Sequence, residues 1–401
     1  MDQHQEDSYW YWYWCWYLRT RTCLVSSMSR ARCLVLSNGM AGAEKQAVAL
    51  AERIGLPFEI RNVVLPTAVA RLPTSLLCAA AGTGYFGSFV GSALASPHPQ
   101  IAISCGRGSI AASVALREAS GGHTLTVHVQ RPECSSQWFD LVVVPRHDVA
   151  DASSAPPNMI LTDGSLHGVS ESSLGGARRE WQSVLRPLPA PRLAVLLGGT
   201  LSRRWWHKPL APELTAASAT ALVRSAVAAI AAHDGSLLIT TSRRTPPDAC
   251  DAVANELEAA SAAGVSCRLW TPDEAPNPYL GLLAWADQIV VSPDSINMVT
   301  EACATGKPVY VLTPEECSRR FAAFHERQLE SGRTRAWPGH GGLEPSTEWS
   351  RADVHGPSDT ARAAARVVEM LRDRHGDLAF SFSALDLDKR RGHPNSRTRL
   401  A

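Results

Sequence analysis

Residues 33–54 have the sequence CLVLSNGMAGAEKQAVALAERI, from which the fold class can be inferred. Its first four residues form a continuous apolar run, which predicts a buried strand, and Ser37-Asn-Gly39 predicts a turn. After the turn, apolar side chains recur at the spacing of one helix face, at Ala43, Ala47, Leu50, Ala51 and Ile54. A strand, a turn and a helix in this order are the repeating unit of parallel α/β sheets.

The same unit recurs along the chain. Further strands are predicted at residues 58–64, 101–103, 125–129 and 141–144, with a helix that begins near Ser109. A second series of strands is predicted at 193–197, 237–240, 267–270, 288–291 and 309–312, with helices over 213–232 and up to about Ala263. This rhythm predicts two α/β domains, each a parallel sheet with helices on both faces.

The two series are separated by an irregular region at residues 149–191. Pro156-Pro157, Gly175-Gly176 and the proline-rich run at 187–191 are expected to break regular structure there. We therefore expect a first domain over 32–190 and a second over 191–356, with the boundary near Pro191. A last helix at 359–371, within residues 357–374, is expected to cross back to the first domain. Residues 1–31 and the basic tail at 375–401 are expected to be disordered.

Bulk composition excludes several classes of protein. The chain has 401 residues, of which 45% are hydrophobic and 19% charged, as in globular proteins with a sizeable core. A formal net charge of +1 argues against a nucleic-acid binder. The ten cysteines include no CxxC pair and no zinc-type spacing, so we expect reduced thiols in a cytosolic protein and no metal site.

Two segments bear on membranes. The aromatic run at residues 10–17 is too short to span a bilayer, so the alternatives are a disordered leader and an anchor at the membrane surface. Residues 76–95 carry no charge and include Gly87-x-x-x-Gly91, but they are weakly hydrophobic and lie between strands. We expect a buried or half-buried connection rather than a membrane span, and at most peripheral membrane association.

Candidate site residues in the first domain follow strands, where ligands of parallel sheets bind. Asn38 and Gly39 follow the first strand, and Arg107 follows the third. They predict an anion site, with a tight turn or an interdomain salt bridge as the alternatives. His147 and Asp148 directly follow another strand and could act as a general base with its orienting partner. The alternative for this pair is a structural hydrogen bond.

In the second domain, the candidate residues also stand at strand ends and predict a nucleotide-diphosphate pocket. Backbone amides, hydroxyl groups and an arginine suit phosphates, and a carboxylate nearly two turns into the helix at 296–304 could accept ribose hydroxyls. The alternative is ordinary helix capping. The residues concerned are Gly199, Thr200, Ser242, Arg243, Ser295 and Glu301.

Taken together, several motifs resemble one family, the plant-type mitochondrial fission family called "elongated mitochondria", which has bacterial relatives. The most specific are Pro145-Arg-His-Asp148 and Ala284-Trp-Ala-Asp287, the latter followed by Ser295 and Glu301-Ala302. The resemblance runs over about residues 32–370 in the order of the family. The other matching runs are residues 37–46, 104–107, 139–144, 193–199, 242–246, 277–279 and 294–310.

This resemblance implies a fold and a role. The fold is the B type of glycosyltransferases, with two Rossmann-like domains that face a cleft. The role is that of a cytosolic factor at the outer mitochondrial membrane, which helps to place a dynamin-related GTPase for division. No established reaction comes with the family, and fold alone does not define activity.

Three interpretations of function follow. The leading one is a fission adaptor, a protein-binding module on an enzyme-like scaffold. The second is a nucleotide-sugar glycosyltransferase or epimerase, for which His147 is the only serious candidate base. The third is a nucleotide-sugar sensor, which would combine a ligand pocket with adaptor work.

Overall fold

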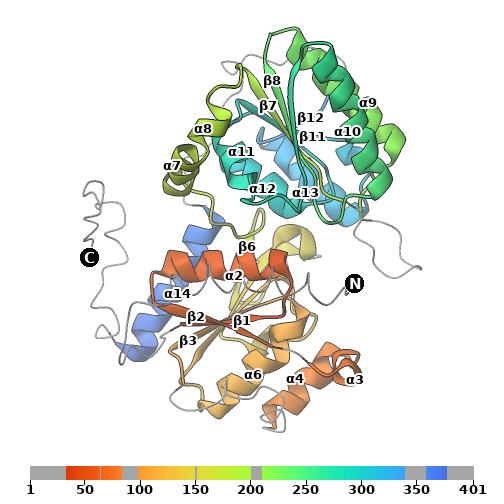
Figure 1. Ribbon diagram of the computed structural model, residues 1–401. Helices are drawn as coiled ribbons and strands as arrows, with labels where there is room; N and C mark the ends of the chain where they lie inside the picture. Colours follow the sequence, from red (N-terminus) through yellow and green to blue (C-terminus); the bar gives the residue numbers. More distant parts are fainter. Residues whose placement is uncertain are drawn as a thin grey trace, which may run out of the picture.

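The computed structural model describes residues 33–63, 65–83, 98–149, 151–199, 210–338 and 358–376. The N-terminal leader at 1–31, Thr200, residues 84–95 of the uncharged segment and the tail from 377 lie outside these ranges. The described residues form two parallel six-stranded sheets that follow one another along the chain (Figure 1). The predicted α/β fold with two Rossmann-like sheets is confirmed.

The first sheet has the strand order β2-β1-β3-β4-β5-β6. Its strands are β1 (Cys33–Ser37), β2 (Phe58–Asn62), β3 (Ile101–Cys105), β4 (Leu125–Val129), β5 (Leu141–Pro145) and β6 (Met159–Thr162). β1, β3, β4 and β5 are buried along their whole length, as expected for central strands between two helical layers. β6 is an addition to the predicted strands and lies in the region that the sequence marked as irregular.

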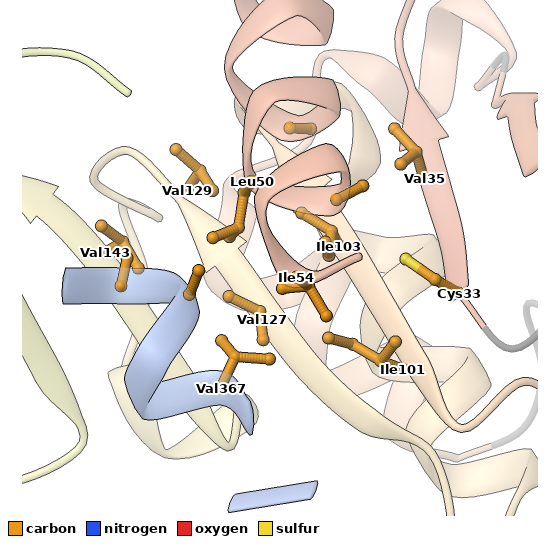
Figure 2. Close-up of a cluster of buried hydrophobic side chains, with 14 of the residues drawn as sticks. Cys33, Val35, Leu50, Ile54, Ile101, Ile103, Val127, Val129, Val143 and Val367 are labelled. Atoms are coloured by element: carbon orange, nitrogen blue, oxygen red, sulfur yellow. The ribbon is translucent and has the colours of Figure 1, made fainter. Parts of the chain in front are cut away.

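Helices cover both faces of this sheet. α2 (Ala41–Ile54) and α14 (Asp359–His375) pack on one face, and their buried side chains share a core with β1, β3, β4 and β5. Figure 2 shows this core, in which Val367 of α14 lies beside Ile101 and Val127 of the strands. α4 (Thr74–Gly82) and α6 (Ile110–Ala119) cover the other face, and the short α3 (Thr67–Ala70) precedes α4.

The second sheet has the strand order β12-β11-β10-β7-β8-β9, the strand order of a dinucleotide-binding Rossmann domain. Its strands are β7 (Arg192–Leu196), β8 (Ser236–Thr240), β9 (Ser266–Trp270), β10 (Gln288–Val291), β11 (Val309–Val311) and β12 (Arg335–Ala336). One face is covered by α9 (Ala216–Ala231) and α10 (Pro247–Ala262). The other is covered by α11 (Tyr279–Trp285), α12 (Ile296–Cys303) and α13 (Arg319–Glu330).

The irregular region contains two helices that the sequence did not predict, α7 (Glu171–Glu180) and α8 (Gln182–Leu185). The expectation that Gly175-Gly176 interrupts regular structure is wrong, because both glycines lie inside α7. A capping box between Ser170 and Ser173 starts this helix, and α7 packs against α11 of the second sheet. α7 and α8 therefore contribute to the core beside the second sheet, although they precede Pro191.

The connection after β6 joins three parts of the molecule. The carboxylate of Asp359, in the first turn of α14, accepts hydrogen bonds from the backbone amides of Asp163 and Gly164 at 2.8 and 3.2 Å. The amide of Ser165 donates to Thr300 Oγ1 of α12 at 3.3 Å. α14 thus packs on the first sheet while its N-terminal end holds the connection between the domains.

Among the described residues, no helix combines the length and the apolar character needed to cross a membrane. In the uncharged segment, the described part is α4, in which Leu77, Cys78 and Ala81 are buried and Leu76 is exposed.

Candidate functional site

Each sheet has one point where the strand order reverses, and ligands of open α/β sheets bind at such points. In the first sheet the point lies between β1 and β3, and in the second between β7 and β10. Asn38 and Gly39 follow β1, and Gly106 and Arg107 follow β3. The loops touch, because a Cβ added to Gly106 would lie 3.3 Å from the side-chain nitrogen of Asn38.

At the first reversal point, Gly39 and Asn38 form a tight turn. Gly39 has a φ of +77°, a left-handed conformation that glycine adopts without strain. The amide of Met40 donates to Asn38 Oδ1 at 3.0 Å, so the Asn38 side chain stabilises the turn that leads into α2. Gly39 is exposed and Asn38 half-buried. Both residues stand where the sequence places them, at the carboxyl end of β1.

Arg107 binds within the first domain. Its Nε donates to Thr74 Oγ1 at 3.0 Å, and its Nη2 donates to the backbone carbonyl of Leu72. The guanidinium group therefore holds the start of α4. This geometry supports neither of the two roles considered for Arg107, anion binding and an interdomain salt bridge.

At the second reversal point, one carboxylate organises the loops. The amide of Gly199 donates to Asp294 Oδ2 at 2.9 Å, and Ser292 Oγ donates to Asp294 Oδ1 at 2.6 Å. Gly198 donates to Ser292 Oγ at 2.7 Å, and the guanidinium group of Arg244 lies 3.1 Å from Asp294 Oδ2. The amides of Gly198 and Gly199 are thus already hydrogen-bonded, and the carboxylate of Asp294 lies beside them.

The loop after β8 meets this carboxylate through residues next to those predicted. Thr245 Oγ1 donates to the carbonyl of Gly198, and a Cβ added to Gly199 would lie 1.8 Å from the carbonyl oxygen of Arg244. Ser242 and Arg243 are not the contacting residues: the Ser242 hydroxyl accepts from the amide of Arg244 at 3.2 Å, and Arg243 is exposed. Asp294 itself was missed, although it directly precedes the predicted residue Ser295 in the loop after β10.

The N-terminal ends of α2 and α12 meet across the domains. Gln46 Nε2 donates to Asn297 Oδ1 at 3.2 Å, and Asn297 Nδ2 donates to the carbonyl of Gly42 at 3.4 Å. Ser295 caps α12 by accepting from the amide of Met298 at 3.4 Å. Each helix N-terminus carries roughly half a positive charge, so two such ends in contact favour an anion near them.

Glu301 lies on α12 near this junction. Tyr279 OH donates to Glu301 Oε2 at 2.5 Å, and Lys45 Nζ of α2 lies 5.7 Å from the centre of the Tyr279 ring. Burial raises the pKa of Glu301, although the hydrogen bond from Tyr279 and the charge of Lys45 act in the opposite direction. The predicted ribose acceptor is therefore engaged by a tyrosine, and a cation of the first domain stands nearby.

His147 and Asp148 lie in the contact between domains, in a short 3₁₀ helix, η4 (Arg146–Asp148). Asp148 forms an ion pair with Arg320 of α13, and the His147 ring packs edge-on against Phe324 at 5.4 Å. His147 Nε2 lies 3.3 Å from Asp148 Oδ1, and the His147 side chain is 3% exposed. Burial lowers the pKa of His147 to about 4, so the ring is neutral at neutral pH. This geometry favours the structural interpretation of the pair over the catalytic one.

The described residues include no group of histidine, cysteine, aspartate and glutamate side chains that could hold a metal ion.

The candidate site consists of two parts. One is the network around Asp294, and the other is the junction of α2 and α12 with Lys45, Tyr279 and Glu301.

Two Rossmann-like sheets joined at the carboxyl ends of their strands define the class of protein: an α/β protein with the fold of B-type glycosyltransferases. The solved UDP-GlcNAc 2-epimerase of Neisseria meningitidis, bound to UDP-GlcNAc, is similar with a TM-score of 0.51 at 13% identity, covering 85% of this chain and 99% of that one. Within this class, the chain belongs to the mitochondrial fission ELM1 family, whose model matches residues 41–371.

Two relatives accompany the family match. The mitochondrial fission protein ELM1 of Arabidopsis thaliana is 31% identical over 299 residues, which cover 70% of this chain and 66% of that protein. An uncharacterized protein of Rickettsia prowazekii is 22% identical over 262 residues, covering 58% of this chain and 70% of the relative. The matched part is thus just under two thirds of the Arabidopsis protein. The family resemblance predicted from the motifs is confirmed.

Proposed function

We propose that the chain is a mitochondrial fission factor that acts at the cytosolic face of the outer mitochondrial membrane and helps to place a dynamin-related GTPase there. Membership of the mitochondrial fission family supports this role, and the family match spans both sheets. An adaptor is favoured over an enzyme because groups that follow the ends of the strands are already bound by other residues or buried. The amides of Gly198 and Gly199 are engaged by Ser292 and Asp294, and His147 is buried between the domains.

Recruitment can be tested with purified components. Mitochondria stripped of peripheral proteins are incubated with a purified dynamin-related GTPase, with and without this chain, and sedimented. We expect the chain to increase the amount of GTPase in the pellet. Equal amounts of GTPase in the pellet with and without the chain would exclude a role in recruiting the GTPase. If the chain binds the GTPase in solution but not on the mitochondria, the proposed site of action at the outer membrane would be excluded.

We further propose that the junction of α2 and α12 holds a nucleoside diphosphate or a nucleotide sugar, which would make the adaptor a sensor. The supporting observation is the meeting of two helix N-termini, joined through Asn297, Gln46 and Gly42. Within the described residues, the amides of Ile296 and Asn297 form no hydrogen bond, so they are available to an anion. Lys45 adds a positive charge beside this junction.

Glu301 is the residue through which this second proposal can be tested. Titration calorimetry with UDP on the full chain would compare wild type with Glu301→Ala. We expect binding to weaken by about 1–3 kcal/mol, the scale of a lost hydrogen bond to a charged group. Glu256→Ala is a matched control, because Glu256 pairs with Arg224 on α9 and lies outside the junction.

The result also separates the three interpretations. If the wild-type chain binds no UDP, only the adaptor interpretation remains. Binding without turnover supports the sensor, and release or transfer of the sugar from a UDP-sugar supports a glycosyltransferase or an epimerase.

A further inference from the structure

Two cysteines of the first domain bring their thiols into contact. Cys78 lies in the middle of α4, and Cys134 lies in the loop between β4 and η3 (Ser136–Trp138). The Cys78 thiol donates to Cys134 Sγ, and the two sulfur atoms are 3.3 Å apart. The sulfur atoms of a disulfide are about 2.05 Å apart, so a small side-chain movement would bring these two within bonding distance.

The two thiols differ in how accessible they are. Cys78 is fully buried in a core with Leu77, Ala81, Ile110 and Phe139. Cys134 packs at the margin of this core and is partly exposed. A small oxidant can therefore reach Cys134, and the buried Cys78 thiol lies next to it.

The hydrogen bond also makes the two thiols chemically unequal. The bond from Cys78 lowers the pKa of the Cys134 thiol, although burial and the nearby Glu133 act against this. The pKa of Cys78 is raised, because the thiol donates its proton to Cys134 and is buried. Because the thiolate is the reactive form of cysteine, Cys134 is the expected nucleophile and Cys78 the resolving thiol.

We propose that Cys78 and Cys134 form a disulfide with hydrogen peroxide as the oxidant, and that a dithiol reduces this disulfide back to the two thiols. In the first step, Cys134 sulfur attacks one oxygen of the peroxide, the O–O bond breaks, and a sulfenic acid and water form. In the second step, Cys78 sulfur attacks the sulfenic sulfur, the S–O bond breaks, and water leaves with the Cys78 proton. Two thiols are oxidised to one disulfide, and one peroxide is reduced to two water molecules.

Other cysteines of the described chain are poorer candidates. Cys33 is fully buried in the core beneath α2, and burial raises the pKa of its thiol to about 12. Burial also raises the pKa of Cys303 and of Cys317 to about 12. Cys250 is half-buried, and its pKa is raised, mainly by burial.

The disulfide would link α4 to the loop between β4 and η3, on one side of the first sheet. The start of α4 is already bound by Arg107, which follows β3. The loop that carries Cys134 also carries Arg131, whose Nη1 donates to the carbonyl of Asp148 at 3.3 Å in the contact between domains. Oxidation would therefore fix α4 against a loop that reaches the domain junction. This effect is independent of whether a nucleotide binds.

Peptide mapping of the full chain tests the proposal. The reduced protein is treated with hydrogen peroxide, and free thiols are alkylated. The protein is then digested with trypsin and chymotrypsin, which separates Cys78 from Cys105, and the peptides are analysed by mass spectrometry without reduction. We expect a linked pair of peptides containing Cys78 and Cys134, lighter by two hydrogen atoms than the separate peptides and separated by dithiothreitol. Cys250→Ser is the control and should form the same link.

Two variants separate the roles of the thiols. In Cys78→Ser, we expect a sulfenic acid on Cys134 that dimedone traps. In Cys134→Ser, which changes the partly exposed position and preserves the buried one, Cys78 should stay reduced. The proposal is overturned if both thiols are still alkylated after treatment with a large excess of hydrogen peroxide, or if Cys134 links to any other cysteine of the chain.

Discussion

Asp148 joins the two domains through a single carboxylate. The side chain is 5% exposed and pairs with Arg320 of α13, which is itself 42% exposed. Because the guanidinium group can turn to water when its partner is lost, the cost of Asp148→Asn is that of a partly screened pair, about 1 kcal/mol. Urea unfolding should show this loss. Glu369→Gln, in an exposed pair with Arg366, should change stability little, and equal losses in both variants would contradict the assignment.

Buried histidines should make the protein sensitive to acid. Burial lowers the pKa of His128 to about 3 and that of His147 to about 4, whereas histidine in an unfolded chain titrates near about 6.5. Below about pH 6.5 the unfolded state therefore binds more protons than the folded state, so stability falls as the pH falls. Each such histidine contributes up to about 1.4 kcal/mol per pH unit until its folded pKa is reached.

The contribution of His128 can be isolated. Its Nδ1 is hydrogen-bonded to Ser104 Oγ at 2.9 Å, and the ring stacks on Phe139. We expect His128→Gln to reduce the slope of unfolding free energy against pH between about pH 6 and 4, whatever it does to stability at neutral pH. His233→Gln, at an exposed position, is the control variant. Parallel slopes for wild type and His128→Gln would show that this histidine is not the source.

At the scale of elements, the central strands could be predicted because they are continuous apolar runs between two helical layers. β6 could not, since its side chains are mostly half-buried and it follows Pro156-Pro157. α7 was not predicted, because its Gly175-Gly176 pair has low helix propensity. The helix forms because packing against α11 and a capping box outweigh that propensity.

The candidate site was predicted to the level of loops but not of side chains. Topology places the loops after β1, β7, β8 and β10 correctly, since the carboxyl ends of parallel strands share one edge. Which residue of a loop turns inward depends on its local hydrogen bonds. In the loop after β8, Thr245 and Arg244 face Gly198 and Gly199 because Ser242 and Thr245 close a turn.

The helical glycines allow a matched prediction. A Cβ added to Gly176 of α7 would meet no atom within 4 Å, whereas one added to Gly281 of α11 would lie 2.5 Å from the Trp181 ring. Gly176→Ala should therefore stabilise the protein by roughly 0.5–1 kcal/mol, the difference in helix propensity, and Gly281→Ala should destabilise it. Thermal unfolding of both variants checks this. A loss of stability in Gly176→Ala would contradict the helix at that position.

At the scale of the whole molecule, α14 completes the first domain from the far end of the chain. Leu371 is 1% exposed and belongs to the core with α2 and the first sheet, and Arg374 of the same helix binds Asp140 at 2.7 Å. Leu371→Ala should cost about 2–5 kcal/mol, the range for truncating a buried leucine. Calorimetry should show this as a lower melting temperature for the first domain. Glu369→Ala, on the exposed side of α14, is the control.

Because α14 packs on the first sheet, the order in which a ribosome makes the chain has a consequence. The strands of the first sheet are complete at Thr162, but the helix that closes their core begins at Asp359. At a synthesis rate on the order of 5–20 residues per second, the newly made sheet waits about 10–40 s with this part of its apolar face uncovered. A nascent chain halted before Asp359 should therefore present that face to chaperones. The strands of the second sheet, in contrast, are all made once Ala336 has been added.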